Sequence, residues 1–148
     1  MKDYMDQALT KAKDAFTQGE VPVGAVIVER GTGEVIAAAA NRSETDKDPS
    51  AHAEILAIRA ACQVRGDVRL PDCDMYVTLE PCTMCAAAIS FARIQNLYFG
   101  AYDLKGGGVD HGARFYQQPT CHHKPNVFGG INETACADLL KQFFKERR

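Results

Sequence analysis

Two short segments contain residue types that could bind a metal ion and carry out catalysis. Residues 52–54 read His-Ala-Glu, and residues 82–85 read Cys-Thr-Met-Cys. One imidazole and two thiolates suit zinc, and a set of three protein ligands leaves one of its four positions open. An open position is typical of catalytic zinc, which makes water a nucleophile near neutral pH. The spacing therefore predicts a catalytic zinc site with His52, Cys82 and Cys85 as ligands.

Glu54 is the predicted proton carrier of this site. It lies two residues after His52, so on a helix it stays in the same turn without pointing in the ligand's direction. Its carboxylate could lean over the open zinc position, take a proton from water and return it to the substrate. We therefore expect Glu54 to act in catalysis without binding the metal.

A Cys-x-x-Cys pair alone is a weak signal, and two other interpretations stay open. It could be a redox pair, because thioredoxin-like motifs also follow a strand and open a helix. It could also be half of a structural zinc site whose fourth ligand is Cys121, His122 or His123. The upstream His-x-Glu and the preceding Pro81 favour the catalytic site over both.

Apolar spacing and turn residues predict the elements that must position these residues. Ser50 is the expected N-cap of the helix that carries Glu54, and Pro81 the expected first residue of a helix that runs to about residue 93. Two more helices are expected over residues 3–18 and 132–145, and strands over residues 21–28, 34–40, 74–79, 96–101 and 127–128. This order predicts an α/β fold, a three-layer α/β/α sandwich around a five-stranded mixed sheet.

Length and composition favour one soluble domain. The chain has 148 residues, 46% hydrophobic and 24% charged, which is ordinary for a single globular domain spanning residues 1–148. No apolar run of about 18 residues is long enough to span a membrane. The acidic N-terminal segment lacks the apolar region of a signal peptide, so we expect a cytoplasmic protein.

Charge gives no support for nucleic-acid binding, since the formal net charge is −2. The one dense basic patch is C-terminal and consists of Lys141, Lys145, Arg147 and Arg148. Because the overall charge is slightly negative, any RNA binding must depend on local contacts.

The cysteines outside the Cys-x-x-Cys pair are scattered along the sequence. In a reducing compartment Cys62, Cys73 and Cys136 are expected to be small buried hydrophobic residues.

Residues 49–54 and 78–86 resemble the cytidine deaminase-like superfamily, which carries the His-x-Glu…Pro-Cys-x-x-Cys signature. Residues 20–26, 41–42, 90–94, 99–107 and 143–148 are similar to its tRNA-specific adenosine deaminase branch, so the resemblance covers essentially the whole chain. It implies a cytidine deaminase-like fold, one Zn²⁺ per subunit, and hydrolytic deamination of the wobble adenosine of a tRNA anticodon loop to inosine.

The resemblance also implies how the reacting nucleotide is held. Asn41 would hydrogen-bond the flipped nucleotide, and the backbone around Ala53 and Glu80 would frame the base and the attacking water. Asp103 would contact the backbone of the neighbouring nucleotide. From the residues alone, Asn41 could instead be a turn-forming residue and Asp103 could cap a turn.

Further along the chain, His123 and Phe144 would line a groove for the anticodon loop, with the basic neighbours of Phe144. Phe143 and Phe144 both fall at helical positions, so one of them is expected in the core. A homodimer is also implied, because active sites of this superfamily tend to be completed across a subunit boundary. Two alternatives remain: a deaminase of a free nucleobase such as guanine or cytosine, and a non-catalytic zinc- or RNA-binding module.

Overall fold

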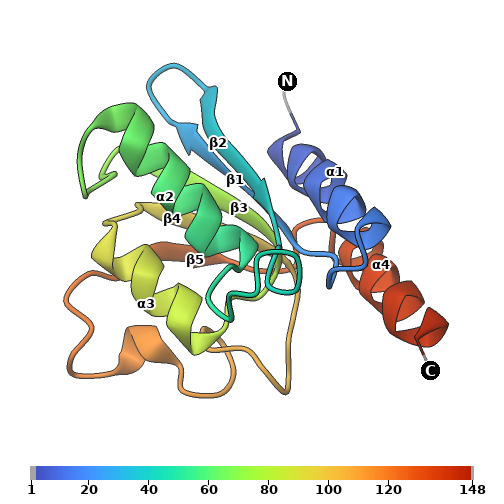
Figure 1. Cartoon of the computed structure of the whole chain (residues 1–148). Coiled ribbons are helices and arrows are strands. Elements are labelled where there is room, and N and C mark those ends of the chain that lie inside the picture. The colour runs from blue at the N-terminus through green and yellow to red at the C-terminus, as the bar shows by residue number, and fades with distance from the viewer. Residues whose placement is uncertain (1–2, 148) are drawn as a thin grey trace.

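A mixed five-stranded sheet lies between two layers of helices in the computed structural model, which describes residues 3–147 (Figure 1). The strands follow the order β2-β1-β3-β4-β5 across the sheet. Strand β1 pairs antiparallel with β2 and β3, whereas β3, β4 and β5 run parallel to one another. Their bounds are Gly24–Glu29 (β1), Glu34–Ala40 (β2), Cys73–Leu79 (β3), Asn96–Ala101 (β4) and Asn126–Phe128 (β5).

Two helices cover each face of this sheet. Helices α1 (Tyr4–Thr17) and α4 (Glu133–Glu146) pack on one face, and α2 (Ala53–Arg65) and α3 (Thr83–Phe91) pack on the other (Figure 1). A short 3₁₀ helix, η1 (Phe115–Gln117), contacts α3. The predicted three-layer α/β/α sandwich and mixed sheet are confirmed. None of the helices described is long and apolar enough to cross a membrane.

Strand β1 is apolar on both sides because both of its faces are covered. Ala25 and Ile27 belong to the larger core, beneath α2 and α3. Val26 and Val28 belong to the smaller core, beneath α1 and α4. The continuous apolar run in the sequence therefore reflects a strand near the middle of a three-layer fold.

Gly24 lets α1 sit directly on the start of β1. A Cβ atom at this position would lie 2.1 Å from the backbone oxygen of Ala8 and 2.6 Å from the backbone nitrogen of Ala12, closer than atoms can approach. The Gly24 nitrogen also donates a hydrogen bond to Oγ1 of Thr78 on β3, at 3.1 Å. These contacts fix the segment before β1, which leads into the site described below.

Three predicted element boundaries are wrong. Ser50 is not a helix cap, because its hydroxyl donates to Asp48 Oδ1 at 2.7 Å and α2 begins after His52. Pro81 is not the first helical residue, because Cys82 is the N-cap of α3, and the helix ends at Phe91. The first strand begins at Gly24 because Val23 and Val21 form a tight local hydrogen bond that interrupts the extended pairing.

Candidate metal centre and active-site cavity

Helices α2 and α3 begin side by side, and their N-terminal ends carry the three predicted ligands (Figure 1). His52 and Cys82 are the N-caps of α2 and α3, both with extended backbone, and Cys85 lies in the first turn of α3. Nδ1 of His52 lies 3.6 Å from Sγ of Cys82 and 3.5 Å from Sγ of Cys85. The structure thus brings together side chains that are thirty residues apart in the sequence.

The spacing of these three atoms fits a tetrahedral zinc ion. Zinc–nitrogen bonds of about 2.0–2.1 Å and zinc–sulfur bonds of about 2.3 Å at tetrahedral angles separate nitrogen and sulfur by about 3.6 Å. The three ligand atoms all lie within 4.8 Å of one another. Within residues 3–147 no other histidine, cysteine or acidic side chain joins this group, so the structure brings no fourth protein ligand from residues 121–123.

The electrostatics of the cluster also favour a cation. A hydrogen bond from the Cys85 thiol, together with one from His52, lowers the pKa of Cys82 to about 4 despite its burial. The hydrogen bond to Cys82, together with burial, raises the pKa of Cys85. Both sulfur atoms lie at the N-terminal end of α3, where the helix dipole stabilises negative charge. The pair therefore holds a thiolate that a zinc ion would neutralise.

Glu54 lies in the first turn of α2, beside the cluster, and its side chain is buried. Burial raises the pKa of Glu54 to about 7. A carboxyl group in this environment can hold a proton and release it close to neutral pH. Glu54 lines the same cavity as His52 and Cys82, and its role in moving protons stays a prediction.

A cavity of about 580 Å³ opens above Glu54 and the metal cluster, within the range of about 300–1,000 Å³ typical of ligand pockets. Four elements contribute to its wall: the segment between α1 and β1, the loop between β2 and α2, the loop after β4, and the last turns of α4. The predicted substrate-binding residues that line it are Asn41, Ala53, Glu80 and Asp103.

Asn41 and Asp103 lie on different walls of the cavity, and each also organises its own loop. Oδ1 of Asn41 accepts from the hydroxyl of Ser43 at 2.9 Å, and its Nδ2 donates to the Val21 carbonyl at 3.3 Å. Oδ1 of Asp103 accepts from the Gly106 nitrogen at 2.8 Å. Asn41 and Asp103 therefore do stabilise turns in their own loops, as the residue types alone suggested. Contact with a substrate remains open to both, because both also line the cavity.

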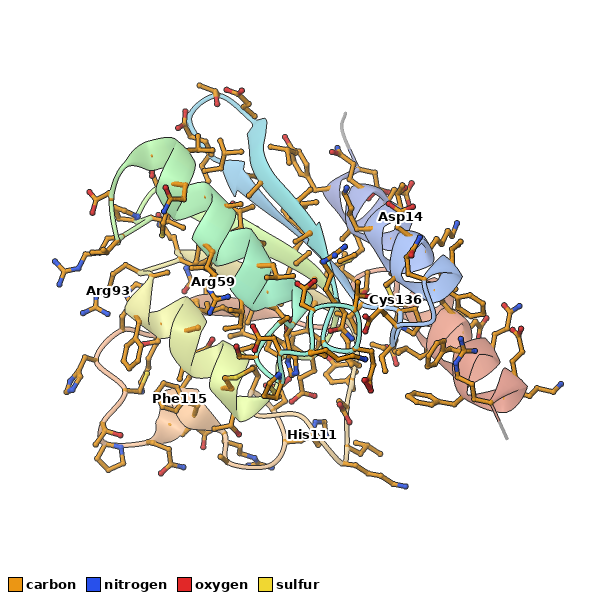
Figure 2. All side chains as sticks on the ribbon, in the orientation of Figure 1. Asp14, Arg59, Arg93, His111, Phe115 and Cys136 are labelled. Atoms are coloured by element: carbon orange, nitrogen blue, oxygen red, sulfur yellow. The ribbon has the colours of Figure 1, made fainter. Side chains whose placement is uncertain are left out.

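The carboxylate of Glu80 is occupied within the protein. Its two oxygens accept hydrogen bonds from four backbone nitrogens of the loop after β4 and from Nδ1 of His111, the last at 2.8 Å. Figure 2 shows His111 on this loop, below the N-terminal end of α3. Burial works against ionisation of Glu80, but these hydrogen bonds outweigh it and lower its pKa. The carboxylate of Glu80 is therefore used within the protein, and contact of its backbone with a substrate stays a prediction.

Glu20 is a buried cavity residue to which the sequence analysis assigned no role of its own. Its carboxylate accepts hydrogen bonds from the nitrogen and hydroxyl of Thr45, both at 2.6 Å, and from the nitrogen of Glu44 at 3.1 Å. Burial works against its ionisation, but these hydrogen bonds and the charge of Arg42 lower its pKa. The feature of the sequence that could have pointed to Glu20 is its position: it is an acidic residue between Gly19 and the apolar segment that starts at Val21.

The structure does not bring His123 and Phe144 into this cavity. His123 packs behind α3, where its Nε2 hydrogen-bonds the Ile94 carbonyl at 2.7 Å. Phe144 is exposed on α4 beside Lys141 and Lys145, whereas its buried neighbour Phe143 lines the cavity. The expectation that one of the two phenylalanines is in the core is confirmed, and the RNA contacts of His123 and Phe144 stay predictions.

Residues 1–101 match the family model described as the cytidine and deoxycytidylate deaminase zinc-binding region. The match covers more than half of the chain and contains all three predicted ligands. The chain belongs to this zinc-binding deaminase family. The resemblance drawn from the two motifs is thereby confirmed, and so is the zinc cofactor expected for it.

Individual members of the deaminase family are similar to the chain over nearly its full length. The tRNA-specific adenosine deaminase of Agrobacterium fabrum is 56% identical over 145 residues, which are 98% of this chain and 94% of the relative. A solved structure from work on A-to-I editing by tRNA:A34 deaminases has a TM-score of 0.89 and 55% identity, covering 92% of this chain and 97% of the other. Guanine deaminase from Bacillus subtilis has a TM-score of 0.66 and 32% identity, covering 99% and 94%.

Proposed function

We propose that this protein deaminates the wobble adenosine of a tRNA anticodon loop to inosine by zinc-dependent hydrolysis. The observation that carries the reaction class is the cavity of about 580 Å³ whose floor is formed by His52, Cys82 and Glu54. The choice of tRNA adenosine is supported by the relatives, because the Agrobacterium fabrum protein, named for that activity, shares 56% of aligned residues.

In this proposal His52, Cys82 and Cys85 hold the zinc ion, and Glu54 moves the protons. Bound zinc supplies a Lewis acid that makes water a nucleophile near neutral pH. The Glu54 carboxylate accepts a proton from the attacking water and gives it to a ring nitrogen of the base. The carboxylate then takes the second proton from the hydroxyl group that the water has added to the ring carbon and gives it to the exocyclic amine, which leaves as ammonia while the carbonyl forms. Burial of Glu54 keeps bulk water away from these transfers.

The walls of the cavity orient the reacting nucleotide. The Asn41 amide faces the cavity from the loop before α2, and the backbone at Ala53 and Glu80 faces it from beside the metal cluster. An adenosine must leave its stack to reach the cavity floor, and single-stranded anticodon loops allow this at low cost. In this proposal Asp103, which also lines the cavity, contacts the neighbouring nucleotide.

Substrate choice is tested by giving the purified zinc-loaded protein an anticodon stem-loop with adenosine at the wobble position, and in parallel free guanine, cytosine and adenine. We expect inosine at the wobble position of the RNA, detected by mass spectrometry of its nucleosides, and little ammonia from the free bases. Ammonia release from a free base without inosine in the RNA would contradict the proposed substrate.

A free purine such as guanine is the second candidate substrate, because one side of the cavity is closed by the end of the chain. Phe143 and Arg147 of the C-terminal segment both line the cavity, and the Arg147 guanidinium lies 3.7 Å from the centre of the Phe143 ring. A cavity closed in this way suits a small molecule. The same assay distinguishes the two candidates.

We further propose that the chain acts as a homodimer of single deaminase domains spanning residues 1–148. Met84 and Phe91 are 39% and 66% exposed, and their spacing of seven residues places them on one side of α3. A second copy packed there would cover an apolar strip next to the metal centre. A cytoplasmic location, expected from the sequence, stays a prediction.

A further inference from the structure

Two loops contribute to the wall of the cavity, and each is held by one buried carboxylate. Residues 41–52 join β2 to α2 and bring Asn41 to the cavity, and residues 102–112 follow β4 and bring Asp103 to it. Neither loop contains a helix or strand that could fix its shape. Hydrogen bonds to the rest of the molecule must therefore help to set the positions of Asn41 and Asp103, as the bond from Asn41 Nδ2 to the Val21 carbonyl already does.

Glu20 performs this task for the first loop. Its side chain is 1% exposed, and its carboxylate receives the three hydrogen bonds from Glu44 and Thr45, so both oxygens are used within the protein. Glu20 lies on the segment that Gly24 fixes against α1, so it belongs to the rigid part of the molecule. The loop is thereby attached to the scaffold three residues after Asn41.

Glu80 performs the same task for the second loop. It follows β3 directly, and its carboxylate receives the nitrogens of Asp103, Val109, Asp110 and His111 and the imidazole of His111. The loop approaches so closely that a Cβ atom on Gly107 would lie 2.4 Å from Oε2 of Glu80. Asp103 is thus held at its own backbone nitrogen.

We propose that Glu20 and Glu80 are positioning residues, each of which sets one substrate-binding wall of the cavity from the rigid scaffold. Neither carboxylate needs to touch the substrate, because its oxygens are already occupied. A buried carboxylate that accepts several backbone hydrogen bonds is hard to replace. The amide of glutamine has the same shape but only one acceptor oxygen, and its NH₂ group would face a backbone N–H that also needs an acceptor. The consequence for substrate binding rests on the proposed function above.

The test compares Glu20→Gln and Glu80→Gln with the wild-type protein by amide hydrogen exchange and by kinetics on the anticodon stem-loop. In Glu20→Gln we expect faster exchange at the nitrogens of Glu44 and Thr45 and unchanged exchange at residues 109–111. In Glu80→Gln the pattern is reversed. For Glu20→Gln we expect KM for the stem-loop to rise about tenfold or more, with a smaller fall in kcat and an unchanged zinc content.

Glu34→Gln is the matched control, because Glu34 is exposed at the far end of β2 and loses the same charge. It should match the wild type in exchange and kinetics. Faster exchange in both loops of each variant would show general destabilisation and overturn the proposal, and so would unchanged exchange or an unchanged KM. If the wild type converts no adenosine, the proposed function fails, while the exchange pattern still decides whether the carboxylates hold the loops.

Discussion

His52 and Cys82 occupy N-cap positions, where the extended backbone lets a side chain leave the helix axis and meet a neighbour. This places one nitrogen and two sulfurs at the separations of a tetrahedral zinc ion while leaving the cavity side open. Glu54 lies in the first turn of α2, the helix whose N-cap is His52, so the proton carrier and one ligand are held by the same helix. The chemistry therefore depends on where two helices begin.

Zinc is expected to stabilise the fold, and this stabilisation should require His52. An ion that binds only the folded state stabilises it by about 2.7 kcal/mol at 100 times its Kd. Thermal unfolding should therefore shift upward when zinc is added to the metal-free protein, and the shift should be lost in His52→Ala. An equal shift in His52→Ala would show that zinc binds elsewhere.

At the scale of elements, the segment from Gly19 to Gly24 links the helix α1 to the cavity. Gly24→Ala is expected to destabilise the protein by about 1–3 kcal/mol, because the added methyl group would meet the backbone of Ala8 and α1 must move. Gly31→Ala is the control, since a Cβ atom there meets nothing within 4 Å. Chemical denaturation measures both, and equal stability of the two variants would show that α1 is not held in this way.

Glu20 should also leave a signature in the acid stability of the protein. Its folded-state pKa is lowered below the ordinary value of 4.5, so its ionised form stabilises the fold. This contribution is fully present above pH 4.5 and is lost as the pH falls through the lower folded-state pKa. When the pH is lowered from neutral to below 4.5, we expect the free energy of unfolding to fall less in Glu20→Gln than in the wild type. Parallel acid-denaturation curves for the two would contradict this.

The sequence predicts local features well and contacts between distant segments poorly. The ligands and Glu54 were found because their residue types and short spacings are characteristic, and the strands because their apolar runs are bounded by turns. Ser50 and Pro81 were placed wrongly at helix starts, since in the structure the residues that cap the helices are the metal ligands themselves. Glu20 was missed because its partners, Glu44 and Thr45, lie more than twenty residues away.

At the scale of the whole molecule, the exposed apolar side of α3 is the feature that bears on assembly. Phe91→Glu should convert the proposed homodimer to a monomer, because a buried charge without a partner opposes association. Phe144→Glu is the control, since Phe144 is 47% exposed and lies on α4, which packs on the other face of the sheet from α3. Light scattering during gel filtration measures the mass, and a wild-type monomer would exclude the dimer.

Deamination of adenosine in RNA depends on Glu54 as the proton carrier beside the zinc-binding cluster. The most direct test is the rate of inosine formation in an anticodon stem-loop by the zinc-loaded wild type and by Glu54→Gln, with zinc content measured in both. We expect equal zinc content and a rate that falls by about 100- to 10,000-fold in the variant. Wild-type turnover by Glu54→Gln at equal zinc content would contradict the account.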